Sequence, residues 1–300
     1  MNEKPPLQAW LLLLLLALVW GSSFILIKKG LVSLSPLEVG SIRMLSASIT
    51  LLPFVISRFK LIRREKIKYF IAVGLSGSFI PAFLFAIAQT RIESAVTGIL
   101  NTLTPLFTVL FGLWFFKQRQ KASVWIGIVV GFIGSVLLIT AGSEGQLSKI
   151  NFYGFFIIIA TMLYATNSNL IKYQLSEYRS VTITSISLFV VGPFAAITLF
   201  GFSDFTSKLG QEGTLQAVLY ICLLGVLGTA IALIIFNKIV QLTNPVFTSS
   251  VTYIIPVIAV VWGLIDGETL LLSHLLGMLA VLIGVYITNQ THLIRKSGRR

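Results

Sequence analysis

The chain has 300 residues, of which 56% are hydrophobic and only 11% are charged, and its mean hydropathy is +0.92. A soluble domain carries about 25% charged residues. These few charges cannot cover a surface that faces water, so the composition excludes a soluble globular protein and indicates an integral membrane protein.

Ten apolar segments follow one another along the chain, separated by short loops. A helix needs about 20 apolar residues to cross the hydrocarbon core of a bilayer. Blocks of this length favour helices over barrel strands, in which apolar and polar residues alternate over about 10 residues. The predicted spans are 9–28, 36–57, 69–89, 95–116, 123–141, 152–173, 181–201, 215–238, 246–265 and 271–291. We therefore predict an all-α integral membrane protein with ten transmembrane helices and no attached soluble domain.

The first segment has features of a secretory signal, because Lys4 precedes a Leu-rich run. However, the run continues as far as Ile27, and the segment has a counterpart later in the chain. We expect it to be retained as a span.

The second half of the sequence repeats the first. An offset of 151 places Gly77 on Gly228 and Pro105 on Pro256, and an offset of 144 places Lys28 on Lys172. We place the two repeats at residues 1–146 and 147–300, with five spans each. Because five is odd, the second repeat enters the membrane from the opposite side. Such inverted repeats are common in secondary transporters.

The distribution of basic residues predicts the orientation. If the N-terminus is cytoplasmic, 17 of the 23 Lys and Arg residues lie on the inner side. Cytoplasmic loops attract Lys and Arg, so both termini are expected inside. The net charge of +13 is then mainly a topology signal, and no nucleic-acid partner is expected. The cluster from Arg58 to Lys68 is expected to touch anionic lipid head groups.

Segment one carries Trp20 and Ser23 on one helical face. Trp20 lies well inside the span, whereas tryptophans usually sit at the membrane interface. It is interpreted either as a residue that stacks on a substrate or as packing. In segment three, Phe79 and Phe83 lie four residues apart and either line the same cavity or pack in the core.

Arg43 lies several residues inside segment two, and charged residues within spans are rare and usually functional. Glu38 is five positions away on a different helix face, so no local partner is expected. Arg43 is interpreted as an attractor for a substrate carboxylate; a structural salt bridge and a snorkelling side chain are the alternatives. Glu38 is the acidic residue nearest to mid-span, which makes it the candidate for proton coupling, and facilitated diffusion is the alternative.

Segments four and nine share a polar face and a proline. Their polar residues recur three or four positions apart, so they lie on one side of each helix. Proline frees backbone carbonyls, which then need another partner. We predict that both helices form cavity walls with gating prolines, and the alternative is hydrogen bonding between helices. The site residues proposed here are Asn101, Thr104, Thr252 and Tyr253, with Pro105 and Pro256 as gates.

Segment six adds Tyr164 and Asn167, three residues apart on one face. Segments five and ten carry small residues at close-packing spacing, which indicates scaffold packing or a dimer contact. The protein is therefore expected to be a monomer or a homodimer. These small residues are Gly127, Gly131, Gly134, Gly277, Ala280 and Gly284.

No cofactor, metal site or enzymatic activity is expected. The single Cys222 cannot form an intramolecular disulfide, and His274 and His292 have no metal-ligand spacing. The sequence has no paired carboxylates, HExxH motif, phosphate-binding loop or nucleophile with a nearby base.

Several short motifs resemble those of EamA-type proteins in the drug/metabolite transporter superfamily. They are the run Trp20-Gly21-Ser22-Ser23-Phe24 followed by Lys28, Arg43 with Leu45 and Ala47, and the run from Pro256 through Gly263 to Gly267-Glu268, followed by Gly277 and Gly284. The resemblance covers essentially the whole chain. Glu268 is interpreted either as part of this signature or as a residue that starts a helix.

The resemblance implies a ten-helix basket with a central cavity lined by helices one, three, four, six, eight and nine. It implies a protein of the bacterial cytoplasmic membrane that exports small metabolites, often amino acids, with membrane lipids as its other partner. It transfers no particular substrate. A lipid-carrier flippase is the alternative within the superfamily, and a channel is an alternative from another class.

Overall fold

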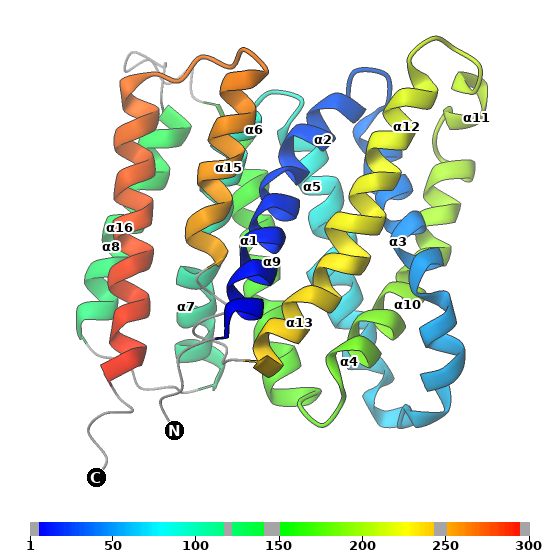
Figure 1. The fold of residues 1–300 in the computed structure, drawn as a ribbon, viewed down its shortest axis with the longest axis horizontal. Coiled ribbons are helices and arrows are strands. Elements are labelled where there is room, and N and C mark those ends of the chain that lie inside the picture. The colour runs from blue at the N-terminus through cyan, green and yellow to red at the C-terminus, as the bar shows by residue number, and fades with distance from the viewer. Residues whose placement is uncertain (1–5, 117–121, 141–150, 243–250, 295–300) are drawn as a thin grey trace.

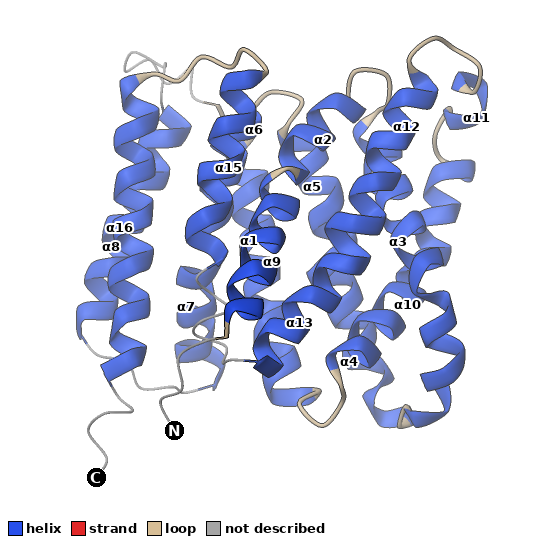
Figure 2. Ribbon diagram, viewed as in Figure 1, coloured by secondary structure: helices blue, strands red, loops and turns tan. Residues whose placement is uncertain are grey.

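The computed structural model describes residues 6–116, 122–140, 151–242 and 251–294. Within these ranges the chain forms helices and loops without strands (Figure 2), so the predicted all-α fold class is confirmed. The α-helices are α1 Leu7–Gly21, α2 Ser23–Gly30, α3 Pro36–Arg58, α4 Ile67–Gly74, α5 Ile80–Ala88, α6 Ser94–Leu100, α7 Thr104–Phe116, α8 Ala122–Thr140, α9 Gly154–Gln174, α10 Ser180–Gly201, α11 Phe205–Lys208, α12 Thr214–Leu223, α13 Ala232–Leu242, α15 Val251–Ile265 and α16 Leu272–Ile294. The 3-10 turns are η1 Phe59–Leu61, η2 Arg64–Lys66 and η4 Asn101–Leu103, and the π-helical segments are η3 Leu75–Phe79 and η6 Leu224–Ile231.

Several spans are built from consecutive helical pieces. Seven stretches of the described chain are long and apolar enough to cross a membrane, and three shorter apolar helices accompany them. The first span joins α1 and α2, the third joins α4, η3 and α5, and the fourth joins α6, η4 and α7. The three shorter helices coincide with predicted spans five, nine and ten.

The two repeats run in opposite directions. At the start of α9, Asn151 Nδ2 donates to the Arg91 carbonyl, 2.7 Å away, so α9 begins where α5 ends. At its far end, the Gln174 carbonyl accepts from Lys66 Nζ at 2.8 Å, beside the start of α4. The first span runs the other way, since α1 begins at the edge where α16 ends (Figure 1). We call the side of Arg91 and Asn151 the predicted outer side.

Each repeat completes the other. Helix α9 of the second repeat packs on α5 and α7 of the first, and α1 of the first repeat packs on α13 and α15 of the second. Likewise α3 packs on η6 and α10 packs on α4. The two halves therefore interlock. The predicted boundary between residues 146 and 147 lies outside the described residues.

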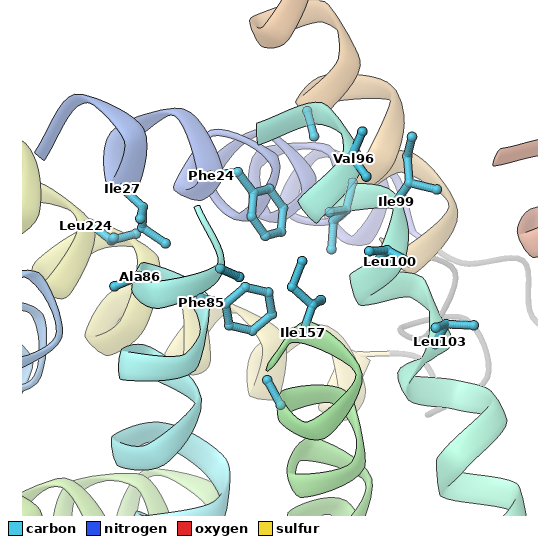
Figure 3. Close-up of a cluster of buried hydrophobic side chains, with 14 of the residues drawn as sticks. Phe24, Ile27, Phe85, Ala86, Val96, Ile99, Leu100, Leu103, Ile157 and Leu224 are labelled. Atoms are coloured by element: carbon cyan, nitrogen blue, oxygen red, sulfur yellow. The ribbon is translucent and has the colours of Figure 1, made fainter. Parts of the chain in front are cut away.

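The largest apolar core lies where the repeats meet. Phe24 of α2 and Phe85 of α5 point toward one another, with ring centroids 6.0 Å apart, and Ile157 of α9 lies beside them (Figure 3). All three side chains are buried. This core holds the first span of one repeat against the third span of the same repeat and the first span of the other.

The glycine stripes of α8 and α16 face each other. A Cβ at Gly284 would lie 2.5 Å from the Gly127 carbonyl oxygen and from the Gly131 nitrogen, and one at Gly134 would lie 2.6 Å from the Val281 nitrogen. The two backbones are in contact, as small residues allow. The stripe therefore serves packing within the chain, which is the scaffold alternative of the prediction, and is not available for a dimer contact.

Candidate functional site

The two π-helical segments occupy equivalent positions in the two repeats. Gly77 lies in η3, and its repeat counterpart Gly228 lies in η6. π-helical turns are rare, and many mark functional sites. The sequence analysis missed both segments; the aligned glycines were the available signal, but they do not distinguish a π turn from a close helix contact.

The predicted polar pairs of spans one and six meet these glycines. Trp20 Nε1 donates to the Gly228 carbonyl at 3.0 Å, and Ser23 Oγ would lie 3.2 Å from a Cβ at Gly228. In the other repeat, the Asn167 amide group would lie within 2.5–2.7 Å of a Cβ at Gly77. The offset of 144 pairs Trp20 with Tyr164 and Ser23 with Asn167. Ser23 and Asn167, which are repeat counterparts, therefore approach the glycines of the two π segments from equivalent positions.

Aromatic rings extend this correspondence. The Trp20 and Phe236 rings lie 5.7 Å apart, and the Tyr164 and Phe85 rings stack at 6.0 Å with an interplanar angle of 25°. Phe85 and Phe236 are themselves repeat counterparts. The structure thus contains two equivalent aromatic pairs, one beside each π segment.

Arg43 lies against η6. Its Nε donates to Thr229 Oγ1 at 3.2 Å, and Tyr164 lies within its electrostatic reach. In the described part of the chain, no carboxylate lies within 4.0 Å of the guanidinium. A structural salt bridge therefore does not account for Arg43 within that part.

The counterpart of Arg43 in the second repeat is Ser187 on α10. A Cβ at Gly225 would lie 2.6 Å from the Arg43 carbonyl oxygen, and one at Gly74 would lie 2.5 Å from the Ser187 carbonyl oxygen. The backbones therefore match closely, whereas the side chains differ. The pseudo-symmetric site carries a positive charge on one side only.

Span four is interrupted at the polar residues. The α-helix stops after Leu100, turns as a 3-10 helix from Asn101, and resumes at Thr104. Pro105 has no N–H for the Asn101 carbonyl, and this oxygen instead accepts from the Thr104 backbone N–H and from Thr104 Oγ1, the latter at 2.9 Å. Asn101 Oδ1 is buried without a hydrogen-bond partner. Pro105 thus lies at the start of a new helical piece, next to an unsatisfied acceptor.

Span nine keeps its proline inside an α-helix. Pro256 is buried within α15, and Thr252 is half-buried one turn before it. The Tyr253 side chain lies outside the described part of the structure. Helix α15 packs tightly on the first span, since a Cβ at Gly21 would lie 2.5 Å from Ile258 Cβ.

Phe79 and Phe83 pack in the core. Their rings form an edge-to-face pair at 4.9 Å. The Phe83 ring fills the space above Gly40 of α3, where a Cβ would lie 2.5 Å from it. Phe79 lies against the buried cluster of Met44 and Ala47. Of the two interpretations of these phenylalanines, the contacts favour packing.

Glu38 occupies the start of α3. It accepts from the Ser35 backbone N–H at 2.7 Å in a capping box, and Lys208 Nζ lies 2.8 Å from it. Its side chain is 1% exposed. The carboxylate therefore takes part in the cap at the predicted outer end of α3 and forms an ion pair with Lys208.

A cluster of charged and polar residues links several helices on the predicted outer side. Glu268 Oε1 accepts from Lys28 Nζ at 2.8 Å and from the Ser94 N–H and hydroxyl at 2.9 and 2.7 Å, and Oε2 accepts from the Ala95 N–H at 3.0 Å. Asp266 pairs with Lys28 at 2.7 Å and also with Lys29. We call these residues the outer closure: Lys28, Lys29, Ser94, Asp266 and Glu268.

Glu268 caps a helix that is distant in sequence. Its carboxylate binds the first N–H groups of α6, where a negative charge is favourable. Burial alone would raise the pKa of Glu268, but the hydrogen bonds from Lys28, Ser94 and Ala95 outweigh burial and hold it below its ordinary value. Glu268 does not start the helix that follows it, because α16 begins at Leu272; the helix that it caps is α6 of the other repeat.

Comparison with known proteins agrees with this architecture. The EamA-like transporter family model matches residues 7–140 and again 151–290. An uncharacterized transporter of Archaeoglobus fulgidus is 27% identical over 94% of this chain and 98% of its own length, and the uncharacterized inner membrane transporter YedA of Escherichia coli K12 is 26% identical over 85% and 82%. A probable amino-acid metabolite efflux pump of Salmonella typhimurium is 24% identical over 96% and 97%.

A solved crystal structure shares the fold, with a TM-score of 0.65 and 15% identity, over 97% of this chain and 99% of that one. The family model covers both halves of the chain separately, and this agrees with the two interlocked repeats. The chain therefore belongs to the EamA-like transporter family and is a multi-pass membrane transporter of that family.

Proposed function

We propose that the protein exports small amphipathic metabolites that carry a carboxylate, with amino acids as the first class to test. The observation that carries this proposal is Arg43, a cation within a span that has no carboxylate partner among the described residues. A charge in this position needs a counter-charge. A substrate carboxylate supplies one through charge-assisted hydrogen bonds.

The neighbouring side chains suit the rest of such a substrate. Trp20 and Tyr164 offer aromatic faces on the two sides of the pseudo-symmetric site. Asn101 Oδ1 and Asn167 Oδ1 are buried amide oxygens without donors, and an ammonium group can donate to an amide oxygen. An amino acid combines these features: a carboxylate for Arg43, an ammonium for an amide oxygen, and a side chain for the rings.

Movement would be alternating access between the interlocked repeats. The broken span four and the proline-containing span nine act as gates, and the outer closure must open to release substrate. Export is the proposed direction, in keeping with the efflux pump from Salmonella typhimurium. The proposed setting is a bacterial cytoplasmic membrane with both termini inside, as the basic loops predict.

Transport is driven either by coupling to protons or, as facilitated diffusion, by the gradient of the substrate itself. Coupling through Glu38 requires this carboxylate to leave its contacts with Ser35 and Lys208 during the cycle. Transport by a Glu38→Gln variant that keeps the full pH dependence would exclude coupling through this residue.

The test is uptake and counterflow in proteoliposomes with radiolabelled amino acids, together with matched amines and carboxylic acids. We expect saturable uptake of carboxylate-bearing compounds and exchange against internal substrate. Arg43→Gln removes a charged hydrogen bond that contributes about 1.5–3 kcal/mol, so we expect a loss of about tenfold to a hundredfold. The control is Arg58→Gln on the same helix, since Arg58 also bonds a threonine hydroxyl, that of Thr182 at 3.1 Å, but at the predicted inner end.

The alternatives predict different results in the same assay. A channel would give uptake without saturation or counterflow. A lipid-carrier flippase would transport none of the soluble compounds and would move a lipid-linked substrate instead. Equal transport by wild type and Arg43→Gln would contradict the proposed carboxylate site.

A further inference from the structure

A cavity of about 170 Å³ lies on the predicted outer side, away from Arg43 and the π segments. It is bounded by the loop between α5 and α6, the start of α9, the end of α8 and the start of α16. Val96 and Leu100 form part of its apolar wall, and Arg91, Glu93, Asn151 and His274 supply its polar groups.

Glu93 is the unsatisfied member of this cavity. Its carboxyl group accepts a backbone hydrogen bond from Thr269, but its buried Oε2 has no hydrogen-bond partner. Burial, together with the negative charge of Glu268, raises the pKa of the Glu93 carboxyl. Glu93 as a whole is only half-buried and lines the cavity, so its carboxyl group can accept a further hydrogen bond from a molecule bound there.

Arg91 places a positive charge at the same cavity. Its guanidinium is exposed at the cavity and has no carboxylate within 4.0 Å in the parts of the chain that the structure describes. The two other polar residues are already oriented. Asn151 donates to the Arg91 carbonyl at 2.7 Å and accepts from the Tyr153 N–H, which fixes this wall. His274 Nδ1 accepts from the Leu271 N–H at 3.0 Å, so its Nε2 carries the hydrogen in the neutral ring.

We infer that this cavity is a second binding site, which takes a small zwitterion with an aliphatic side chain. The ammonium group donates to the Glu93 carboxylate, the carboxylate binds Arg91, and the aliphatic part lies on Val96 and Leu100. The charges of the cavity are of both signs and are not paired with each other, which excludes a simple cation or anion as the best ligand. The inference goes beyond the proposed transport site, because none of these residues touches Arg43.

The position of the site gives it a role at the exit. Glu93 immediately precedes Ser94, whose N–H and hydroxyl hold Glu268 in the outer closure. The ammonium group of a bound zwitterion neutralises the Glu93 carboxylate. This weakens the repulsion between Glu93 and Glu268 and favours the closed arrangement. External product would then restrain further export.

The test uses equilibrium binding of radiolabelled L-leucine to the full-length protein in nanodiscs, in an Arg43→Gln background that removes the central site. We expect saturable binding there. Glu93→Gln should weaken it at least about tenfold, because one charged hydrogen bond is lost. Isopentylamine and 4-methylpentanoate each carry half of the zwitterion and should compete poorly.

Two further variants separate binding from folding. Glu93→Asp keeps the charge and should retain part of the affinity, and Ile92→Trp should block the cavity without changing a charge. Absence of saturable binding in the Arg43→Gln background, or binding that survives both Glu93→Gln and Ile92→Trp, would overturn the second site. Neither result bears on the central site, which is judged by transport in protein with Arg43 intact.

Discussion

Arg43 and Ser187 occupy equivalent positions on α3 and α10, and the backbone contacts around them are nearly the same. Gly225 allows η6 to approach Arg43, and Gly74 allows the third span to approach Ser187. Only the first repeat places a charge there. A duplicated scaffold has therefore kept its packing while one side chain of the pair acquired a different chemistry.

The close approach at Gly225 gives a prediction about stability. A Cβ at this position would collide with Ser46 Oγ and lie 2.6 Å from the Arg43 carbonyl oxygen. Backbone cannot move aside cheaply, so Gly225→Ala should destabilise the protein by about 1–3 kcal/mol, the usual cost of overpacking. Thermal unfolding in detergent measures this. Gly201→Ala is the control, because nothing lies within 4 Å of its Cβ position, and equal melting temperatures for both variants would contradict the packing.

At the scale of elements, spans four and nine share a proline but differ in shape. Span four is broken at Asn101, whereas α15 continues through Pro256. In span four the backbone N–H and the hydroxyl of Thr104 both donate to the Asn101 carbonyl, in place of the hydrogen bond that Pro105 cannot make. Equivalent prolines thus coincide with a break in the helix in one repeat and with only a missing backbone hydrogen bond in the other.

Restoring that bond should impair transport. Pro105→Ala adds the α-helical N–H at position 105 that the Asn101 carbonyl lacks, and it should stabilise a continuous helix. The gate should then move less and the initial rate of transport should fall. Pro256→Ala should have a similar effect in span nine. Uptake by proteoliposomes is the measurement, and unchanged rates in both variants would refute the gating role.

The outer closure predicts a dependence of stability on pH. Hydrogen bonds from Lys28 and Lys29 lower the pKa of Asp266, and the pKa of Glu268 is also lowered. Carboxylates with a depressed folded-state pKa stabilise the protein above their ordinary values of 3.8 and 4.5, and this stabilisation disappears as the pH falls through the folded-state values. Wild type should therefore lose its advantage in melting temperature over Glu268→Gln as the pH falls from about 7 to below about 4. A difference that does not change with pH would show that the ionised carboxylate is not what stabilises the closure.

At the scale of the whole molecule, the fold was largely predictable because it depends on segment length and on the repeat. Ten apolar segments and an odd number per repeat determine an inverted, interlocked bundle. The offset of 144 between the repeats also pairs Trp20 with Tyr164, and in the structure each of these rings lies beside a phenylalanine of the other repeat.

The remaining features depend on contacts that spacing does not reveal. Glu268 binds Ser94 across 174 positions, and no local pattern indicates such a partner. The π segments contain Gly77 and Gly228, each in close contact with another helix, and a helical wheel does not represent such contacts. Phe83 shares a helical face with Phe79, but its contact with Gly40 depends on how two helices meet.

The predicted orientation can be tested with single cysteines. In a Cys222→Ala background, Lys60→Cys should be modified by a membrane-impermeant thiol reagent only in inside-out vesicles, and Gln211→Cys only in right-side-out vesicles. Both positions are exposed, at opposite ends of the bundle. The reverse pattern would overturn the orientation derived from the basic loops.

Alternating access around the π segments is the central claim, and Asn167 is the position that tests it most directly. An Asn167→Cys variant in the Cys222→Ala background would be exposed to the same impermeant reagent from each side in turn. Ile197→Cys in that background is the control, since Ile197 is an apolar, exposed position on α10. The account predicts that the thiol of the Asn167→Cys variant is modified from both sides, without a continuous leak, and that the thiol of the Ile197→Cys variant is not modified. Modification of the Asn167→Cys variant from one side only, or an ion leak that accompanies its modification, would contradict it.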